Sequence, residues 1–80
     1  MSFRDDMQRW VIEAIQASGN EGSIIEIAKH IWLNHQNDLR EAGDHFFSWQ
    51  YDMRWAAQHL RDRHKLGIKK LGSKSIWYIR

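Results

Sequence analysis

The chain has 80 residues without cysteine or proline, and 42% of them are hydrophobic, including five tryptophans. This length predicts a single domain, residues 1–80, whose core depends on packing because disulfides and thiolate zinc sites are excluded. No apolar run approaches the roughly 20 residues of a membrane span. The N-terminal segment lacks the apolar core of a signal peptide. We therefore expect a cytoplasmic protein with no membrane partner.

The net charge of +2 is distributed unevenly along the sequence. Residues 1–53 contain four basic and nine acidic residues, a net charge of −5, whereas residues 54–80 contain eight basic residues and one acidic residue, a net charge of +7. A basic segment that also carries aromatic and amide side chains is typical of a surface that binds a polyanion. The alternative is a solvated surface whose charges are segregated without a partner.

The first predicted helix covers residues 3–17. Ser2 and Asp5 resemble a capping box, and apolar residues recur at helical spacing from Phe3 onward. Gly19 and Asn20 follow the last apolar position, and both residue types adopt the left-handed conformation that ends helices. The pattern therefore predicts a helix that stops before residue 19.

The second predicted helix begins at Ile24, after an S-x-x-E capping box formed by Ser23 and Glu26. Its apolar stripe extends to Ala42, which favours a helix that ends there with Gly43 as its stop. Alternatively, the helix ends near Asn34 and a polar loop follows. The longer helix is favoured because a polar loop of about a dozen residues is uncommon in a small domain.

The third predicted helix covers about residues 48–64, with Ser48 as its N-cap. At 100° per residue, one arc is suited to a core and the opposite arc is polar and cationic. The core arc contains Phe46, Trp49, Met53, Ala56, Ala57, Leu60 and His64, and the opposite arc contains Tyr51, Arg54, Trp55, Gln58, Arg61 and Asp62. A short turn at residues 43–45 joins this helix to the preceding one, which predicts a helix-turn-helix.

After Lys65 the apolar period changes from 3.6 toward 2. Two β-rich runs, residues 66–71 and 75–80, flank a Gly-Ser-Lys turn, which predicts a hairpin. Trp77 and Ile79 share the face expected to pack on the helices. The predicted fold is therefore mainly α with a small β-hairpin, a three-helix winged helix-turn-helix with the element order α-α-α-β-β.

The segment DMRWAAQHLRDRHKLGIKKLGSKSIWYI, residues 52–79, resembles the recognition helix and wing of bacterial winged-helix domains. It is most similar to the N-terminal domain of Mrr-type modified-DNA restriction proteins, which share an Arg-Trp-Ala-like start, a basic turn and a Trp in the last strand. The resemblance implies DNA binding and no cleavage. Such domains usually have Gly directly after the recognition helix, where this chain has Arg63-His64-Lys65.

Double-stranded DNA is therefore the expected partner, with the third helix in the major groove and the hairpin on phosphates. Arginine can pair bidentately with guanine and glutamine with adenine, whereas lysine contacts phosphates as a point charge. The candidate contacts are Ser48, Gln50, Tyr51, Arg54, Gln58 and Arg61 on the helix and Lys69, Lys70 and Lys74 on the hairpin. Such a protein is expected to be a small transcription regulator or the targeting module of a restriction-like system.

The competing class is a winged helix that binds another protein or a second copy of itself through Trp55 and Tyr51. An enzyme is not expected, because the sequence contains no phosphate-binding loop or nucleophile elbow. We expect no metal, cofactor or small-molecule substrate. The histidine pairs His30/His35 and His59/His64 are five residues apart, rather than the three or four that align ligands on one helix face.

Overall fold

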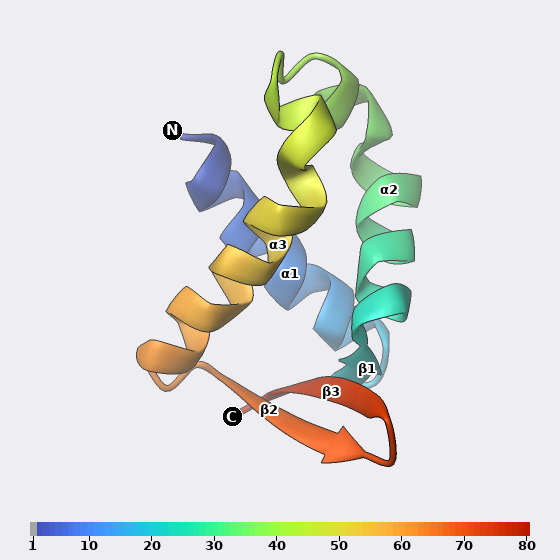
Figure 1. The fold of residues 1–80 in the computed structure, drawn as a ribbon, viewed down its shortest axis with the longest axis vertical. Helices are drawn as coiled ribbons and strands as arrows, with labels where there is room; N and C mark the ends of the chain where they lie inside the picture. The colour runs from blue at the N-terminus through green and yellow to red at the C-terminus, as the bar shows by residue number, and fades with distance from the viewer. Residues whose placement is uncertain (1) are drawn as a thin grey trace.

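The computed structural model describes residues 2–80 and has a winged-helix layout (Figure 1). Its elements, in chain order, are α1 (Phe3–Ala17), β1 (Glu21–Ser23), α2 (Ile24–Arg40), α3 (His45–Asp62), β2 (Leu66–Leu71) and β3 (Lys74–Ile79). Helix α3 crosses in front of α1, α2 runs along one side, and the small antiparallel sheet lies at one end of the helices (Figure 1). The predicted class, mainly α with a C-terminal hairpin, is confirmed.

Helix α1 has the predicted bounds, and local hydrogen bonds explain both ends. At its start the Ser2 hydroxyl accepts from the Asp5 amide at 3.2 Å. At its end Gly19 has a φ of +84°, and the Asn20 amide donates to the Ile15 carbonyl at 3.0 Å. This left-handed turn satisfies helix carbonyls that would otherwise lack a partner.

Helix α2 combines features of both predicted alternatives. The Ser23–Glu26 capping box is formed in both directions, and the helix continues past Asn34 to Arg40. However, His35 has a non-helical φ of −133°, so the helix is kinked where the shorter alternative ended. The His35 ring stacks on Trp10 of α1 with a centroid distance of 4.4 Å. This contact joins the kink to α1, and the final turn beyond it keeps Leu39 fully buried.

Helix α3 begins at His45, three residues before the predicted start, so the assignment of Ser48 as its N-cap is wrong. Gly43 has a φ of +64°, and the Phe46 amide donates to the Gly43 carbonyl at 3.1 Å. Glycine therefore allows a tight turn that starts the helix immediately after it. Ser48 lies inside the first turns, where its hydroxyl donates to Asp52 Oδ2 at 3.0 Å.

The exit from α3 uses a histidine in the left-handed conformation that glycine adopts most readily. His64 has a φ of +61°. Its amide donates to the Arg61 carbonyl, and the Lys65 amide donates to the Leu60 carbonyl, both at 3.0 Å. These two bonds define a Schellman motif, which turns the chain sharply from the helix into β2.

Strand β1 is a feature that the sequence pattern did not predict. It pairs antiparallel with β3, with Gly22 opposite Trp77, so that β3 is the central strand in the order β1-β3-β2. The Ile79 amide also donates to the Asn20 carbonyl at 3.1 Å. The hairpin is therefore attached to the segment directly before α2.

The predicted core is confirmed except on the core arc of α3 at Phe46, which is half-buried, and at His64, which is exposed because it forms the left-handed turn after the helix. Trp10, Ile31, Met53, Leu60 and Trp77 belong to one buried cluster that all three helices and the sheet contribute to. Asp52 is the buried charged residue among those that the structure describes, and it is 3% exposed. Within residues 2–80, no helix combines the length and the apolar composition that crossing a membrane requires.

Replacing His64 by glycine should stabilise the domain. A left-handed conformation costs a residue with a Cβ about 1–2 kcal/mol, and the greater freedom of glycine in the unfolded chain offsets about 0.5–1 kcal/mol of that gain. We expect His64→Gly to raise the free energy of unfolding by roughly 0.5–1 kcal/mol in denaturant titrations.

Arg63 provides the matched control, because its φ of −93° is ordinary for any residue. Arg63→Gly should lower the free energy of unfolding, since it adds only flexibility. A His64→Gly variant that is less stable than the wild type would contradict the proposed strain at this turn.

Candidate nucleic-acid interface

The face of α3 opposite the core carries a continuous row of exposed side chains, here called the outer stripe. Its members follow one another at spacings of four, three, four and three residues, which places them on one side of a helix. All of them are exposed. The outer stripe consists of Phe47, Tyr51, Arg54, Gln58 and Arg61.

The outer stripe contains two cations without a partner in the described part of the chain. Neither Arg54 nor Arg61 forms an ion pair within residues 2–80. Gln58 donates through Nε2 to Asp62 Oδ1 at 3.1 Å, an exposed contact within the helix. The two guanidinium groups are therefore available to a ligand, and Gln58 becomes available when one solvent-exposed hydrogen bond opens.

Ser48 and Gln50, the other helix residues predicted as contacts, lie beside the outer stripe. Gln50 is exposed on its flank. Ser48 is half-buried, and its hydroxyl donates to Asp52. The same Asp52 carboxylate lies 3.2 Å from His45 Nδ1 and 4.0 Å from Arg4 Nε. Ser48 therefore belongs to a polar cluster that joins the start of α3 to α1.

The three hairpin lysines differ in their surroundings. Lys69 Nζ lies 3.5 Å from Glu21 Oε2 of β1 and 5.4 Å from the centroid of the Tyr78 ring. Lys70 and Lys74 are exposed, and neither forms an ion pair with another residue of the 2–80 segment. Lys69 therefore stabilises the sheet, whereas Lys70 and Lys74 present their charge outward.

A hollow of about 460 Å³ connects α3 to the turn of the hairpin. Arg54 borders it from α3, Lys74 borders it from the hairpin, and the N-terminal turn of α2 forms its floor. Its full lining is Ser23, Ile24, Ile25, Glu26, Arg54, Ser73, Lys74 and Ser75. The fold therefore brings one cation of the outer stripe, Arg54, and one cation of the hairpin, Lys74, to the same hollow.

The pKa of Glu26, which lines this hollow, responds to the positive charges nearby. The pKa of Glu26 is lowered from its ordinary value, chiefly because the Ser23 amide donates to its carboxylate, and also because the Ser23 hydroxyl takes part in the capping box. The positive charges of Lys74 and Lys29 lower this pKa further. Lys74 is thus close enough to α2 to act on an acid at its first turn.

Trp55 is half-buried rather than open to a partner. The guanidinium of Arg4 lies over its ring at 4.4 Å, and the His59 ring stacks on it with a centroid distance of 5.1 Å. Trp55 therefore packs within the fold, on Arg4 and His59. Phe47, which the sequence interpretation did not select, is instead the most exposed large hydrophobic residue of α3, at 86%. Its position four residues before Tyr51 was the available signal.

The histidines do not form a metal site in the described chain. His35 Nε2 lies 2.7 Å and His30 Nε2 lies 3.7 Å from Glu13 Oε2, so these side chains link α1 to α2. Among residues 2–80, no group of three histidine, cysteine or acidic side chains could hold a metal ion.

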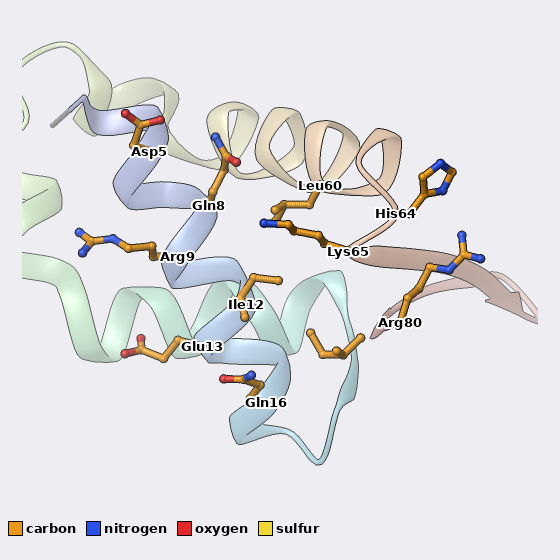
Figure 2. A pocket seen from close by; sticks show the side chains of 11 residues that line it. Asp5, Gln8, Arg9, Ile12, Glu13, Gln16, Leu60, His64, Lys65 and Arg80 are labelled. Atoms are coloured by element: carbon orange, nitrogen blue, oxygen red, sulfur yellow. The ribbon is translucent and has the colours of Figure 1, made fainter.

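Another hollow, of about 660 Å³, lies on the core side of α3, between α1 and the end of β3. Figure 2 shows Arg9 and Glu13 projecting from α1 at its border, whereas His64 and Arg80 point away from α1 at the other end. Leu60 lines it from the core arc of α3. Its mixed charges and its position separate this hollow from the outer stripe.

Comparisons with family models, with curated proteins and with solved structures found no match for this chain.

The contact between the hairpin and α2 can be tested through the titration of Glu26. The pKa of Glu26, followed by NMR of its carboxyl carbon, should lie below that of an unperturbed glutamate. Because this pKa is lowered in the folded state, the interaction stabilises the fold above the unfolded pKa, and its contribution disappears as the pH falls through the folded pKa.

Lys74→Ala should raise the pKa of Glu26, since it removes a nearby positive charge. Lys70→Ala is the matched control and should leave this pKa unchanged. Equal effects of the two substitutions would contradict the arrangement of Lys74 beside the N-terminal turn of α2.

Proposed function

We propose that this chain binds double-stranded DNA, with α3 in the major groove and the β2–β3 hairpin on the phosphate backbone. The observation that carries the proposal is the hollow that Arg54 of the outer stripe and Lys74 of the hairpin border together, with Arg61 and Lys70 exposed on the same two elements. Four exposed cations on a convex helix and hairpin fit the groove and backbone of a duplex better than they fit a small anion. If the chain is bacterial, as the resemblance of residues 52–79 implies, a duplex partner places its action in the cytoplasm.

The proposed contacts divide into two groups by chemistry. Arg54 and Gln58 are one helical turn apart, and their side chains can pair with guanine and adenine, respectively. Lys70 and Lys74 contact phosphates and position the domain. Gln50, Tyr51 and Arg61 flank the base-reading pair. Ser48 and Lys69 contribute least, because each already has a partner within the fold.

The biological role that fits this chemistry is that of a small regulator or of a targeting module, without catalysis. A second candidate is a protein-interaction or dimerisation module, which the exposed rings of Phe47 and Tyr51 favour. Salt dependence distinguishes the two, because counterion release accompanies phosphate contacts and not the burial of apolar rings.

Binding to generic duplex DNA should weaken as salt rises. The logarithm of the affinity should fall against the logarithm of the salt concentration by about 0.9 for each neutralised phosphate. Fluorescence anisotropy with a labelled duplex measures this slope. A duplex that is not bound even at low salt, or a slope of zero, would reject DNA binding and favour the protein-interaction module.

Substitutions should then separate sequence reading from backbone contact. Arg54→Ala should cost about 1–3 kcal/mol on a preferred site and flatten the preference among sequences, because it removes a base contact. Lys70→Ala should weaken binding to all sequences alike and reduce the salt slope by about one unit.

Arg9→Ala is the charge-matched control, because it removes one positive charge outside the proposed DNA-binding surface. Arg9 lies on α1 and borders the hollow on the core side of α3. The substitution should change neither the affinity nor the slope beyond the effect of net charge. If Arg54→Ala and Lys70→Ala act alike on every duplex, then α3 does not read sequence and the domain holds only the backbone.

A further inference from the structure

The N-terminal half of α3 exposes two large rings to solvent. Phe47 is 86% exposed and Tyr51 is 69% exposed, one helical turn apart on the outer stripe. Apolar rings that lie together on the outside of a helix, rather than singly, mark a contact surface. The cations Arg54 and Arg61 continue the same stripe toward the end of the helix.

Phe47 makes one aromatic contact with the fold and is otherwise open to solvent. The Phe46 ring meets it edge-on, with a centroid distance of 5.2 Å and an interplanar angle of 83°. Phe46 in turn lies 6.4 Å from the ring of Trp32 on α2. A row of aromatic contacts thus leads from α2 to Phe47, and the last ring projects beyond the surface with its outer face open.

Base edges in the major groove offer one apolar group, the C5-methyl of thymine, to which phenylalanine is a suitable contact. On the proposed function, on which this inference rests, the outer stripe faces those edges. We infer that Phe47, supported by Tyr51, contacts thymine methyl groups, so that the preferred site contains thymine opposite the N-terminal half of α3. Arg54 and Arg61, which lie further along the same stripe, favour this partner over an apolar protein surface, because they complement the phosphates that flank the bases.

Replacing thymine by uracil removes the methyl group and leaves the hydrogen-bonding edge intact, which gives a direct test. The probes are the duplex enriched from a random pool and the same duplex with uracil at each thymine. Wild-type protein should bind the thymine duplex more tightly by about fourfold for each methyl group contacted. Phe47→Ala should bind both duplexes with the same affinity, and Phe47→Leu should retain most of the preference.

Leu33→Ala is the matched control, because Leu33 is similarly exposed, at 71%, but lies on α2. It should keep the full preference for thymine. Circular dichroism and melting of each variant verify that the fold is intact.

The outcomes separate this inference from the proposed function. If the wild type binds no duplex, the proposed function fails. If it binds both duplexes equally, or if Phe47→Ala retains the preference for thymine, DNA binding stands and the role of Phe47 is wrong. If the wild type sediments as a dimer that Phe47→Ala dissociates, Phe47 belongs to a protein interface and the inference is overturned.

Discussion

Burial of one arc of α3 determines the direction of every exposed side chain on this helix. Trp49, Met53 and Leu60 are buried on that arc, and the two alanines between them, Ala56 and Ala57, are almost fully buried as well. Small residues let a neighbouring helix approach closely, so α3 cannot rotate without exposing the large ones. Because the arc is fixed against the core, the outer stripe must face solvent. The candidate interface is therefore a consequence of packing.

The position of the hairpin depends on two backbone features that lie far apart in the sequence. The Schellman turn at His64 directs the chain out of α3, and the pairing of β1 with β3 attaches the hairpin to the segment before α2. Gly67 also allows the Tyr78 ring to lie across it, since a Cβ there would come within 2.2 Å of that ring. The hairpin lysines are consequently held at a defined place relative to α3.

Sequence patterns predicted the elements that local chemistry specifies. The cap at Ser2, the capping box at Ser23 and the change of period after Lys65 located α1, the start of α2 and the hairpin. The patterns failed where contacts between residues far apart in the sequence determine the local structure. Strand β1 is three residues long and forms because β3 lies beside it. The start of α3 was misplaced because a serine suited to capping lies inside the helix, where Asp52 accepts from it. Distant contacts also limit the site prediction, since Glu21, the partner of Lys69, lies on β1.

The fold also brings some cations of the basic second half of the chain close to acids of the first half. Lys69 is paired with Glu21, and Lys74 lies near Glu26, so acids of the first half of the chain moderate part of the basic second half. Lys70 and the arginines of α3 keep their charge unpaired within residues 2–80.

The two ends of α3 differ in charge. Glu41 and Asp44 are exposed shortly before Phe47 in the sequence, and acids at this end disfavour close phosphates. On the proposed function, the phosphate contacts and the hydrogen bonds of Arg54 and Gln58 to base edges would then arise at the hairpin and the second half of α3, whereas the first half would contribute the apolar base contacts. A preference for thymine contributed by apolar contact would persist at salt concentrations that weaken the phosphate contacts, because salt screens charges and does not weaken the burial of a methyl group.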